Sequence, residues 1–112
     1  MDSNNCIFCK IANKEIPSSL IFENDNIVAF NDLNPQAPVH ILVIPKKHYP
    51  SLNEVDDVNL LGELMSAIRE ITKKLGIKEY RTVLNTGKVA GQEVFHIHFH
   101  ILAGRDMQWP PG

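Results

Sequence analysis

The sequence predicts an α+β fold in which an antiparallel sheet of about five strands packs against one long helix. Short runs rich in β-forming residues are separated by turn sequences, which is typical of neighbouring antiparallel strands. One long segment near the middle carries apolar residues at helical spacing. With 112 residues and 44% hydrophobic content, the chain can bury one core, so we treat residues 1–112 as a single domain.

The first part of the chain predicts a short helix followed by a hairpin. Residues 6–13 are partly apolar and can form one or two helical turns. Residues 20–23 and 27–31 are rich in β-formers, and the turn sequence Asn24-Asp25-Asn26 between them indicates a hairpin. Residues 32–38 contain two prolines and are expected to form a loop, because each proline biases its predecessor away from helix.

The long helix is predicted from about residue 58 to residue 75. Asp56 or Asp57 is a candidate N-cap, and Gly76 is the expected stop. Its apolar residues recur at spacings of three and four: Leu60, Leu61, Leu64, Met65, Ile68, Ile71 and Leu75. We expect this apolar stripe to pack against the sheet.

Three further strands complete the predicted sheet. Residues 39–45 form a nearly continuous apolar run, which is typical of a central strand. Residues 80–85 predict another strand, and the turn-rich segment 86–92 follows it. The last strand is predicted over residues 95–102, which read Phe-His-Ile-His-Phe-His-Ile-Leu.

The alternating histidines of this last segment are the main functional signal. On a strand, every second side chain points to the same face, so His96, His98 and His100 should form one row with neighbours roughly 6.5 to 7 Å apart. Imidazole titrates near neutral pH, binds metals and can act as a nucleophile. Three in alternation therefore indicate chemistry rather than a merely polar strand face.

Such a row allows two kinds of catalysis. One is a zinc site of three imidazoles with an activated water, and the other is nucleophilic attack by one imidazole. Three rings on one strand lie nearly in a line and converge poorly on one ion, so we favour a nucleophile, with His98 in the middle as the best candidate. The upstream segments Asn85-Thr86-Gly87 and Gly91-Gln92 can bring backbone amides close to an anion, which suggests a phosphorus electrophile.

The only two cysteines predict a second site. Cys6 and Cys9 have the spacing Cys-x-x-Cys, which in a reducing compartment indicates metal or redox work before a disulfide. Together with His48 and His96 they would form a structural zinc site with two Cys and two His ligands; the alternative is two free thiols. The remaining histidine, His40, is either a satisfied core residue or a partner that orients the histidine row.

Charge and hydropathy narrow the possible partners. The chain has 11 Lys and Arg against 13 Asp and Glu with no basic block, so we expect no duplex nucleic acid, although a single nucleotide needs only a few donors. No apolar run reaches membrane-spanning length, and residues 1–5 do not begin a signal peptide. We therefore expect a soluble cytoplasmic protein that does not bind membranes.

Residues 96–102 resemble the signature of the histidine triad (HIT) family, in which histidines and hydrophobic residues alternate. Other segments resemble its Hint branch, the histidine triad nucleotide-binding proteins: Ile7-Phe8, Lys14-Glu15-Ile16-Pro17, Pro35-Gln36-Ala37-Pro38, residues 42–48 and Trp109-Pro110-Pro111-Gly112. The resemblance covers essentially the whole chain. It implies a HIT-like fold with a five-stranded antiparallel sheet, one long and one short helix, and a homodimer in which two sheets join into one of ten strands.

The resemblance also implies an activity, namely hydrolysis of purine nucleoside 5'-phosphoramidates, such as adenosine 5'-monophosphoramidate, and of aminoacyl-adenylates. By motif position, His98 would attack the α-phosphorus and form a nucleotidyl-histidine intermediate. His100 would bond the leaving group or the phosphate, and His40 would support the network. No cofactor is implied for this chemistry. The cysteine pair resembles that of members which bind zinc through two Cys and two His, so His96 would be structural.

The implied substrate site takes a purine nucleotide similar to AMP or GMP. Asp32 would bind the ribose hydroxyls, and Asn85, Gly91 and the backbone at Val94 would line the phosphate. The implied apolar pocket around ribose and base consists of Phe8, Ile11, Ile16, Phe30 and Leu33. Glu93 stands where many Hint proteins have Ser or Thr; since a carboxylate repels phosphate, we expect Glu93 to point away or to be protonated on occasion.

Three other functions remain open from the sequence. A dinucleoside polyphosphate hydrolase, as in the Fhit branch, is the runner-up within the family, although the tail at residues 109–112 argues against it. A nucleotide-binding regulatory or interaction protein would use the same residues with incidental catalysis. A metallohydrolase would place all three histidines of the row on one catalytic metal.

Overall fold

The computed structural model describes residues 5–112. Five antiparallel strands form one sheet in the order β1-β2-β3-β5-β4. The strands are β1 (Leu20–Glu23), β2 (Ile27–Asn31), β3 (Val39–Pro45), β4 (Arg81–Leu84) and β5 (Phe99–Ala103). The helix α1 (Ile7–Ala12) precedes β1, and the short 3-10 helix η2 (Leu52–Glu54) and the long helix α2 (Val58–Lys74) lie between β3 and β4. The predicted α+β class, with one long and one short helix, is confirmed.

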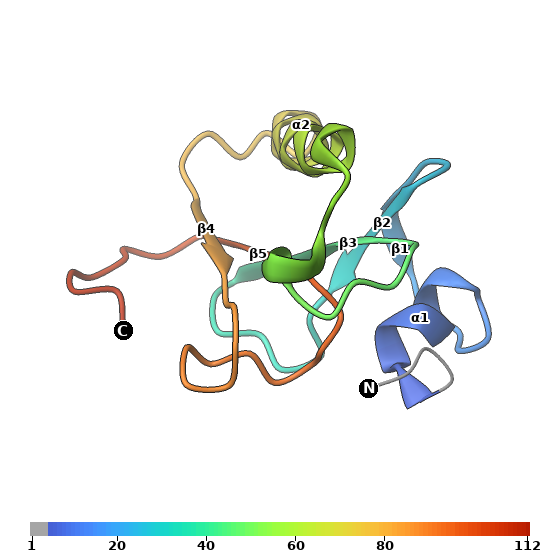
Figure 1. Ribbon diagram of the computed structural model, residues 1–112. Coiled ribbons are helices and arrows are strands. Elements are labelled where there is room, and N and C mark those ends of the chain that lie inside the picture. Colours follow the sequence, from blue (N-terminus) through green and yellow to red (C-terminus); the bar gives the residue numbers. More distant parts are fainter. Residues whose placement is uncertain (1–4) are drawn as a thin grey trace.

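Different helices cover the two faces of the sheet, as Figure 1 shows. Alternate residues of the central strands point to opposite sides. Ile27, Ala29, Ile41 and Val43 belong to the core that α2 covers, whereas Val28, Phe30, Leu42 and Ile44 pack with α1. Burial on both faces explains why residues 39–45 read as a continuous apolar run rather than an alternating one.

The long helix begins and ends where the sequence predicts. Of the two candidate N-caps, Asp57 is the cap, and its carboxylate accepts a hydrogen bond from the Leu60 N–H at 3.1 Å. Gly76 follows the helix with φ of +73°, a conformation that favours glycine.

The predicted apolar stripe of α2 was wrong at two residues. Met65 and Leu75 are 49% and 50% exposed, whereas Ala67 and Thr72 are buried. Met65 is one residue after the buried Leu64 and so lies about 100° further around the helix axis. Leu75 follows the last helical residue as the C-cap.

The predicted strand over residues 95–102 was also wrong in its first half, because β5 begins only at Phe99. The Ile97 N–H donates to the Tyr49 carbonyl at 2.7 Å, outside the ladder between β3 and β5. His96 and His98 therefore precede the strand, and only His100 lies on it. The three histidines do not form the predicted single row on one strand.

Local polar contacts shape the connections. The Asn24 side chain accepts from the N–H groups of Asn26 and Ile27, which closes the predicted β1–β2 turn. The helix η2 was not predicted from the sequence; Ser51 caps it by accepting from the Asn53 N–H. None of the described helices is both long and apolar enough to cross a membrane.

Candidate active site

A cavity of about 770 Å³ lies on the face of the sheet that α1 covers. Its size falls within the range of small-molecule sites. Its wall contains every residue to which the resemblance gives a catalytic or nucleotide-binding role: Phe8, Ile11, Ile16, Phe30, Asp32, Leu33, His40, Asn85, Gly91, Glu93, Val94, His98 and His100. The fold thus gathers residues from α1, β2, β3, β5 and the loops around them.

His98 is buried in this wall with its ring held in one tautomer. Its Nδ1 lies 2.8 Å from the carbonyl oxygen of His96. Because a carbonyl oxygen only accepts, Nδ1 carries the proton and Nε2 keeps a free lone pair. Burial lowers the pKa of His98, which favours the neutral ring. Phe8 packs edge-on against the ring at 5.1 Å between centroids. Because its lone pair is free, Nε2 of His98 is a potential nucleophile.

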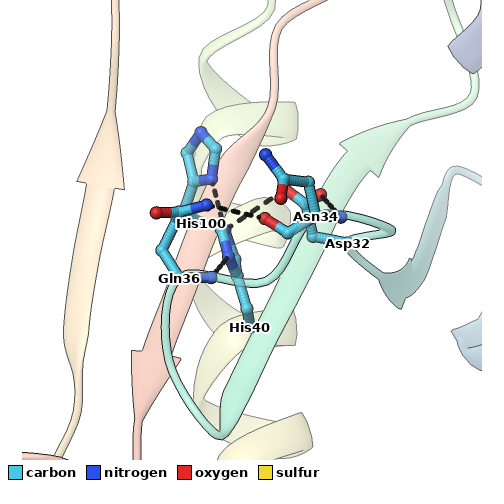
Figure 2. A network of polar contacts seen from close by, with 5 residues as sticks. All are labelled: Asp32, Asn34, Gln36, His40 and His100. Atoms are coloured by element: carbon cyan, nitrogen blue, oxygen red, sulfur yellow. Dashed lines mark hydrogen bonds and ion pairs between the residues drawn. The ribbon is translucent and has the colours of Figure 1, made fainter.

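His40 and His100 form a hydrogen-bonded pair whose proton positions follow from the backbone (Figure 2). The Gln36 N–H donates to His40 Nδ1 at 3.0 Å, so this nitrogen has no proton and His40 carries its proton on Nε2. His40 Nε2 lies 2.8 Å from His100 Nδ1, which must then accept. His100 therefore carries its proton on Nε2.

The surroundings of His100 keep its ring neutral. Burial and the nearby His98 and His40 lower the pKa of His100 to about 4. The rings of His98 and His100 lie 5.0 Å apart between centroids. The same cavity thus offers a lone pair on His98 and an N–H on His100. A reaction at phosphorus needs both groups, because the lone pair can attack the phosphorus and the N–H can donate to one of its oxygens.

Asp32 holds a carboxylate at the cavity wall from the end of β2. One oxygen accepts from the Asn34 N–H at 2.9 Å, and the other lies 3.3 Å from His40 Nε2. The side chain is still 21% exposed. Each carboxylate oxygen has lone pairs left for further donors, such as a pair of vicinal hydroxyls.

The loop before β5 contributes the polar end of the cavity. Gly91 has φ of +100°, and a Cβ there would lie 3.8 Å from the side chain of Asn85. The buried Gln92 shapes this loop, since it accepts from the Gly87 N–H at 2.9 Å and donates to the Pro50 carbonyl at 2.6 Å. Glu93 is exposed and forms part of the cavity wall.

Part of this wall was not predicted from the sequence. Its unpredicted members are Ile7, Pro17, Ser18, Ser19, Asn31, Asn34, Gln36 and Leu42. Gln36 and Asn34 act through main-chain groups, which residue type does not reveal. The two prolines of the 32–38 loop were the available signal, because they restrict the backbone that presents these groups.

Cys6, Cys9, His48 and His96 come together as predicted, and one candidate ligand atom from each lies within 4.8 Å of the others. Cys6 Sγ to His96 Nδ1 is 3.3 Å, Cys9 Sγ to His48 Nδ1 is 3.2 Å, and His48 Nδ1 to His96 Nδ1 is 3.3 Å. Tetrahedral zinc with Zn–S of about 2.3 Å and Zn–N of about 2.0 Å gives ligand separations of roughly 3.3 to 3.8 Å.

The chemistry of this cluster also fits zinc. His96 Nε2 donates to the Pro45 carbonyl at 2.8 Å, which leaves Nδ1 unprotonated and facing the sulfurs. Burial and the neighbouring Cys6 thiol raise the pKa of Cys9 to about 12, so without a cation the thiol is protonated. Because His96 faces the cysteines, the three histidines do not surround one metal, which excludes the tris-imidazole arrangement considered from the sequence.

A second group with metal-binding residue types is Asp32, His40 and His100. Its short contacts are accounted for by the hydrogen bonds that fix the two imidazole tautomers.

Comparisons with known proteins agree on one family. A family model described as the HIT domain matches residues 13–107. An uncharacterized HIT-like protein of Synechocystis sp. is 50% identical over 109 residues, covering 95% of this chain and 96% of that protein. The crystal structure of a HIT family hydrolase from Legionella pneumophila has a TM-score of 0.92 and 49% identity, covering 96% of this chain and 100% of its own. A histidine triad nucleotide-binding protein from Candida albicans has a TM-score of 0.82 and 33% identity, covering 95% and 83%.

Proposed function

This chain belongs to the HIT family, and from that premise we propose that it hydrolyses purine nucleoside 5'-phosphoramidates with His98 as the nucleophile. The observation that carries the proposal is the hydrogen bond from His98 Nδ1 to the His96 carbonyl, which leaves Nε2 free in a cavity of nucleotide size. Two similar structures, the Legionella hydrolase and the Candida nucleotide-binding protein, support hydrolysis and nucleotide binding respectively.

In the first step, His98 Nε2 bonds to the α-phosphorus and the bond from phosphorus to the leaving amine breaks. The amine departs with a proton from solvent, while the His100 Nε2–H donates to a phosphoryl oxygen or to the amine. In the second step, water oxygen bonds to phosphorus, the bond to Nε2 breaks, and the water proton goes to solvent. The net reaction consumes one water and yields a nucleoside monophosphate and the amine. Throughout, the His96 carbonyl holds His98 Nδ1–H and supports the positive charge that develops on the ring.

The cavity wall divides into two chemical halves that suit this substrate. The Asp32 carboxylate can accept from both ribose hydroxyls, and the apolar side chains of Phe8, Ile11 and Phe30 suit a purine. Asn85 and Gly91 line the same cavity as His98 and His100, which supports a phosphate contact at their loop. The same wall would accept the adenylate portion of an aminoacyl-adenylate.

The test compares three substrates on one preparation: adenosine 5'-monophosphoramidate, its guanosine counterpart and a diadenosine polyphosphate. We expect the phosphoramidates to be cleaved with the higher kcat/KM. Faster cleavage of the polyphosphate would indicate that the protein is a dinucleoside polyphosphate hydrolase instead. Nucleotide binding without turnover of any of the three would favour a regulatory nucleotide-binding protein.

We also propose that Cys6, Cys9, His48 and His96 hold a structural zinc ion. When bound, zinc would keep both thiols deprotonated and would join α1 to the chain before β5. Phe8 lies between Cys6 and Cys9 and packs against the His96 and His98 rings at 6.0 and 5.1 Å between centroids. The cluster would thus stabilise the α1 wall of the cavity, while the reaction itself needs no cofactor.

We further propose a homodimer that joins two sheets into one of ten strands. Such a sheet needs a free edge, and the edges here are β1 and β4. The register of β1 shifts between Leu20 and Phe22, and such an irregularity makes an edge strand less suited to pairing with another strand. In contrast, β4 pairs regularly with β5. We therefore assign the joint to β4. A solution mass of a dimer, with amide exchange along β4 that becomes faster on dilution to monomer, would support this; a concentration-independent monomer would exclude it.

A further inference from the structure

We propose that Arg105 and the main-chain amide of Gln36 are positioning groups for the reaction: together they set the tautomer in which His100 meets the substrate. This inference deepens the proposed function and rests on it for its catalytic consequence. Its structural part concerns the ligand-free protein and can be tested without any substrate.

The Gln36 loop is linked to His100 through a single backbone N–H group and the ring of His40 (Figure 2). The Gln36 N–H donates to His40 Nδ1 at 3.0 Å, and His40 Nε2 then donates to His100 Nδ1 at 2.8 Å. If the Gln36 amide moved away, His40 Nδ1 could carry the proton and Nε2 would become an acceptor. His100 Nδ1 would then donate, and His100 Nε2 would turn a lone pair toward the anionic phosphate. The Gln36 N–H and the Asp32 oxygen that lies 3.3 Å from His40 Nε2 thus both favour the tautomer in which His100 attracts the substrate, and the Gln36 N–H is the group that keeps the proton off His40 Nδ1.

A second hydrogen bond holds Gln36 at its carbonyl group. Arg105, just after β5, donates from Nε to the Gln36 carbonyl at 3.0 Å. The preceding Gly104 has φ of +94°, and a Cβ added there would lie 2.9 Å from Pro38 Cβ, so the chain after β5 packs closely on the same loop. Gln36 is therefore held at its carbonyl by Arg105 while its N–H holds His40.

The same loop also carries Asp32, the proposed ribose-binding residue. The position of the loop therefore affects both the His100 tautomer and ribose binding. The Gln36 side chain donates to the Asn34 carbonyl at 3.0 Å, and the Asn34 N–H donates to Asp32 at 2.9 Å. Arg105 itself is exposed and does not line the cavity. Its effect on the reaction would pass entirely through the loop, so the residue is a positioning residue and not a catalytic one.

The main experiment uses two arginine variants that each lose hydrogen bonds to main-chain carbonyls; Arg105 also donates to the carbonyl of its neighbour Asp106 at 3.2 Å. Arg105→Ala removes the donor to the loop, and Arg81→Ala removes the bond from Arg81 Nη2 to the Gln108 carbonyl at 3.1 Å. We measure nitrogen-15 chemical shifts of the histidine rings in the ligand-free proteins, then kcat and KM. In wild type and Arg81→Ala we expect His40 and His100 to be protonated on Nε2. In Arg105→Ala we expect a mixture of tautomers and a kcat lowered about fivefold to tenfold, with KM changed less than about twofold.

A second pair of variants addresses the amide directly. Gln36→Pro removes the N–H, while Gln36→Ala keeps it and removes only the side chain. We expect His100 to move its proton to Nδ1 in Gln36→Pro and to keep it on Nε2 in Gln36→Ala, with kcat of the proline variant lowered about 100-fold or more. If the proline variant does not fold, the ring chemical shifts of Arg105→Ala still test whether the loop sets the tautomer of His100.

Wild-type ring shifts in Arg105→Ala, or a loss of kcat equal to that of Arg81→Ala, would overturn the positioning role. If no variant and no wild-type protein cleaves a phosphoramidate but the ring shifts change as expected, the proposed function fails and the positioning of His100 stands.

Discussion

His96 and His98 are joined through the main chain: the ring of His96 contacts both cysteines, while its carbonyl oxygen accepts the Nδ1 proton of His98 at 2.8 Å. One residue therefore takes part in two sites. Its side chain belongs to the candidate zinc cluster, and its backbone orients the candidate nucleophile.

The first prediction concerns removal of the metal. We expect the purified protein to contain about one zinc per chain, and exhaustive chelation to lower the melting temperature by on the order of 10 °C, because a tightly bound ligand contributes several kcal/mol to a domain of this size. Metal analysis and thermal unfolding with and without a chelator provide the measurement. Cys9→Ser should lose the metal and His98→Ala should retain it; equal metal content in both variants would contradict the assignment.

A second prediction concerns stability at acid pH. Burial and the nearby His98 and His40 lower the pKa of His100 from 6.5 to about 4 in the folded state. Between these values the unfolded chain binds a proton that the folded protein does not, so the free energy of unfolding falls as the pH drops from 6.5 toward 4. Above 6.5 the group has no effect. Urea unfolding of wild type and His100→Asn should show a difference that is constant above pH 7 and shrinks below 6.5. A difference independent of pH throughout would show that His100 titrates normally.

The third prediction concerns recognition of the ribose. If Asp32 accepts from both hydroxyls, wild type should bind a ribonucleotide more tightly than its 2'-deoxy analogue, and Asp32→Asn should lose most of this preference. A hydrogen bond to a charged group contributes about 1.5 to 3 kcal/mol, so we expect a wild-type preference of roughly tenfold or more. Calorimetric titration with both nucleotides measures it. A preference that is the same in wild type and variant would remove Asp32 from the ribose site.

Glu93 gives a fourth prediction, because it lines the cavity beside Gly91 and Val94 with an exposed carboxylate. Repulsion of the substrate phosphate should raise KM, so Glu93→Gln should lower KM by about twofold to fivefold, in keeping with exposed charge interactions below about 1 kcal/mol. The gain should shrink at high salt. An unchanged KM at low salt would mean that Glu93 points away from the phosphate, as the sequence analysis expected.

Much of this fold was predictable because local signals agree with the tertiary structure. The Asn24 turn, the Asp57 cap and the apolar run at residues 39–45 each indicate the element that forms. The first half of the 95–102 strand was not predictable, since alternation does not reveal that Ile97 bonds to Tyr49 rather than to the sheet.

The candidate site divides in the same way. Residue types predicted the cysteine and histidine cluster and singled out His98 as the candidate nucleophile, and family resemblance supplied other residues of the cavity wall but not all of them. The contribution of Gln36 came from neither source. It depends on a backbone N–H and on the contact with Arg105, 69 residues later in the chain.

The central claim is that His98 Nε2 forms a bond to phosphorus, and trapping of the adduct during turnover with an alkaline denaturing quench tests it most directly, because a bond between phosphorus and imidazole nitrogen is labile in acid. Peptide mapping with fragmentation in the mass spectrometer should place one nucleoside monophosphate on His98 itself and none on His40 or His100. The His98→Ala protein should bind nucleotide but neither form the adduct nor turn over. An adduct on another residue, or turnover retained by His98→Ala, would contradict the account.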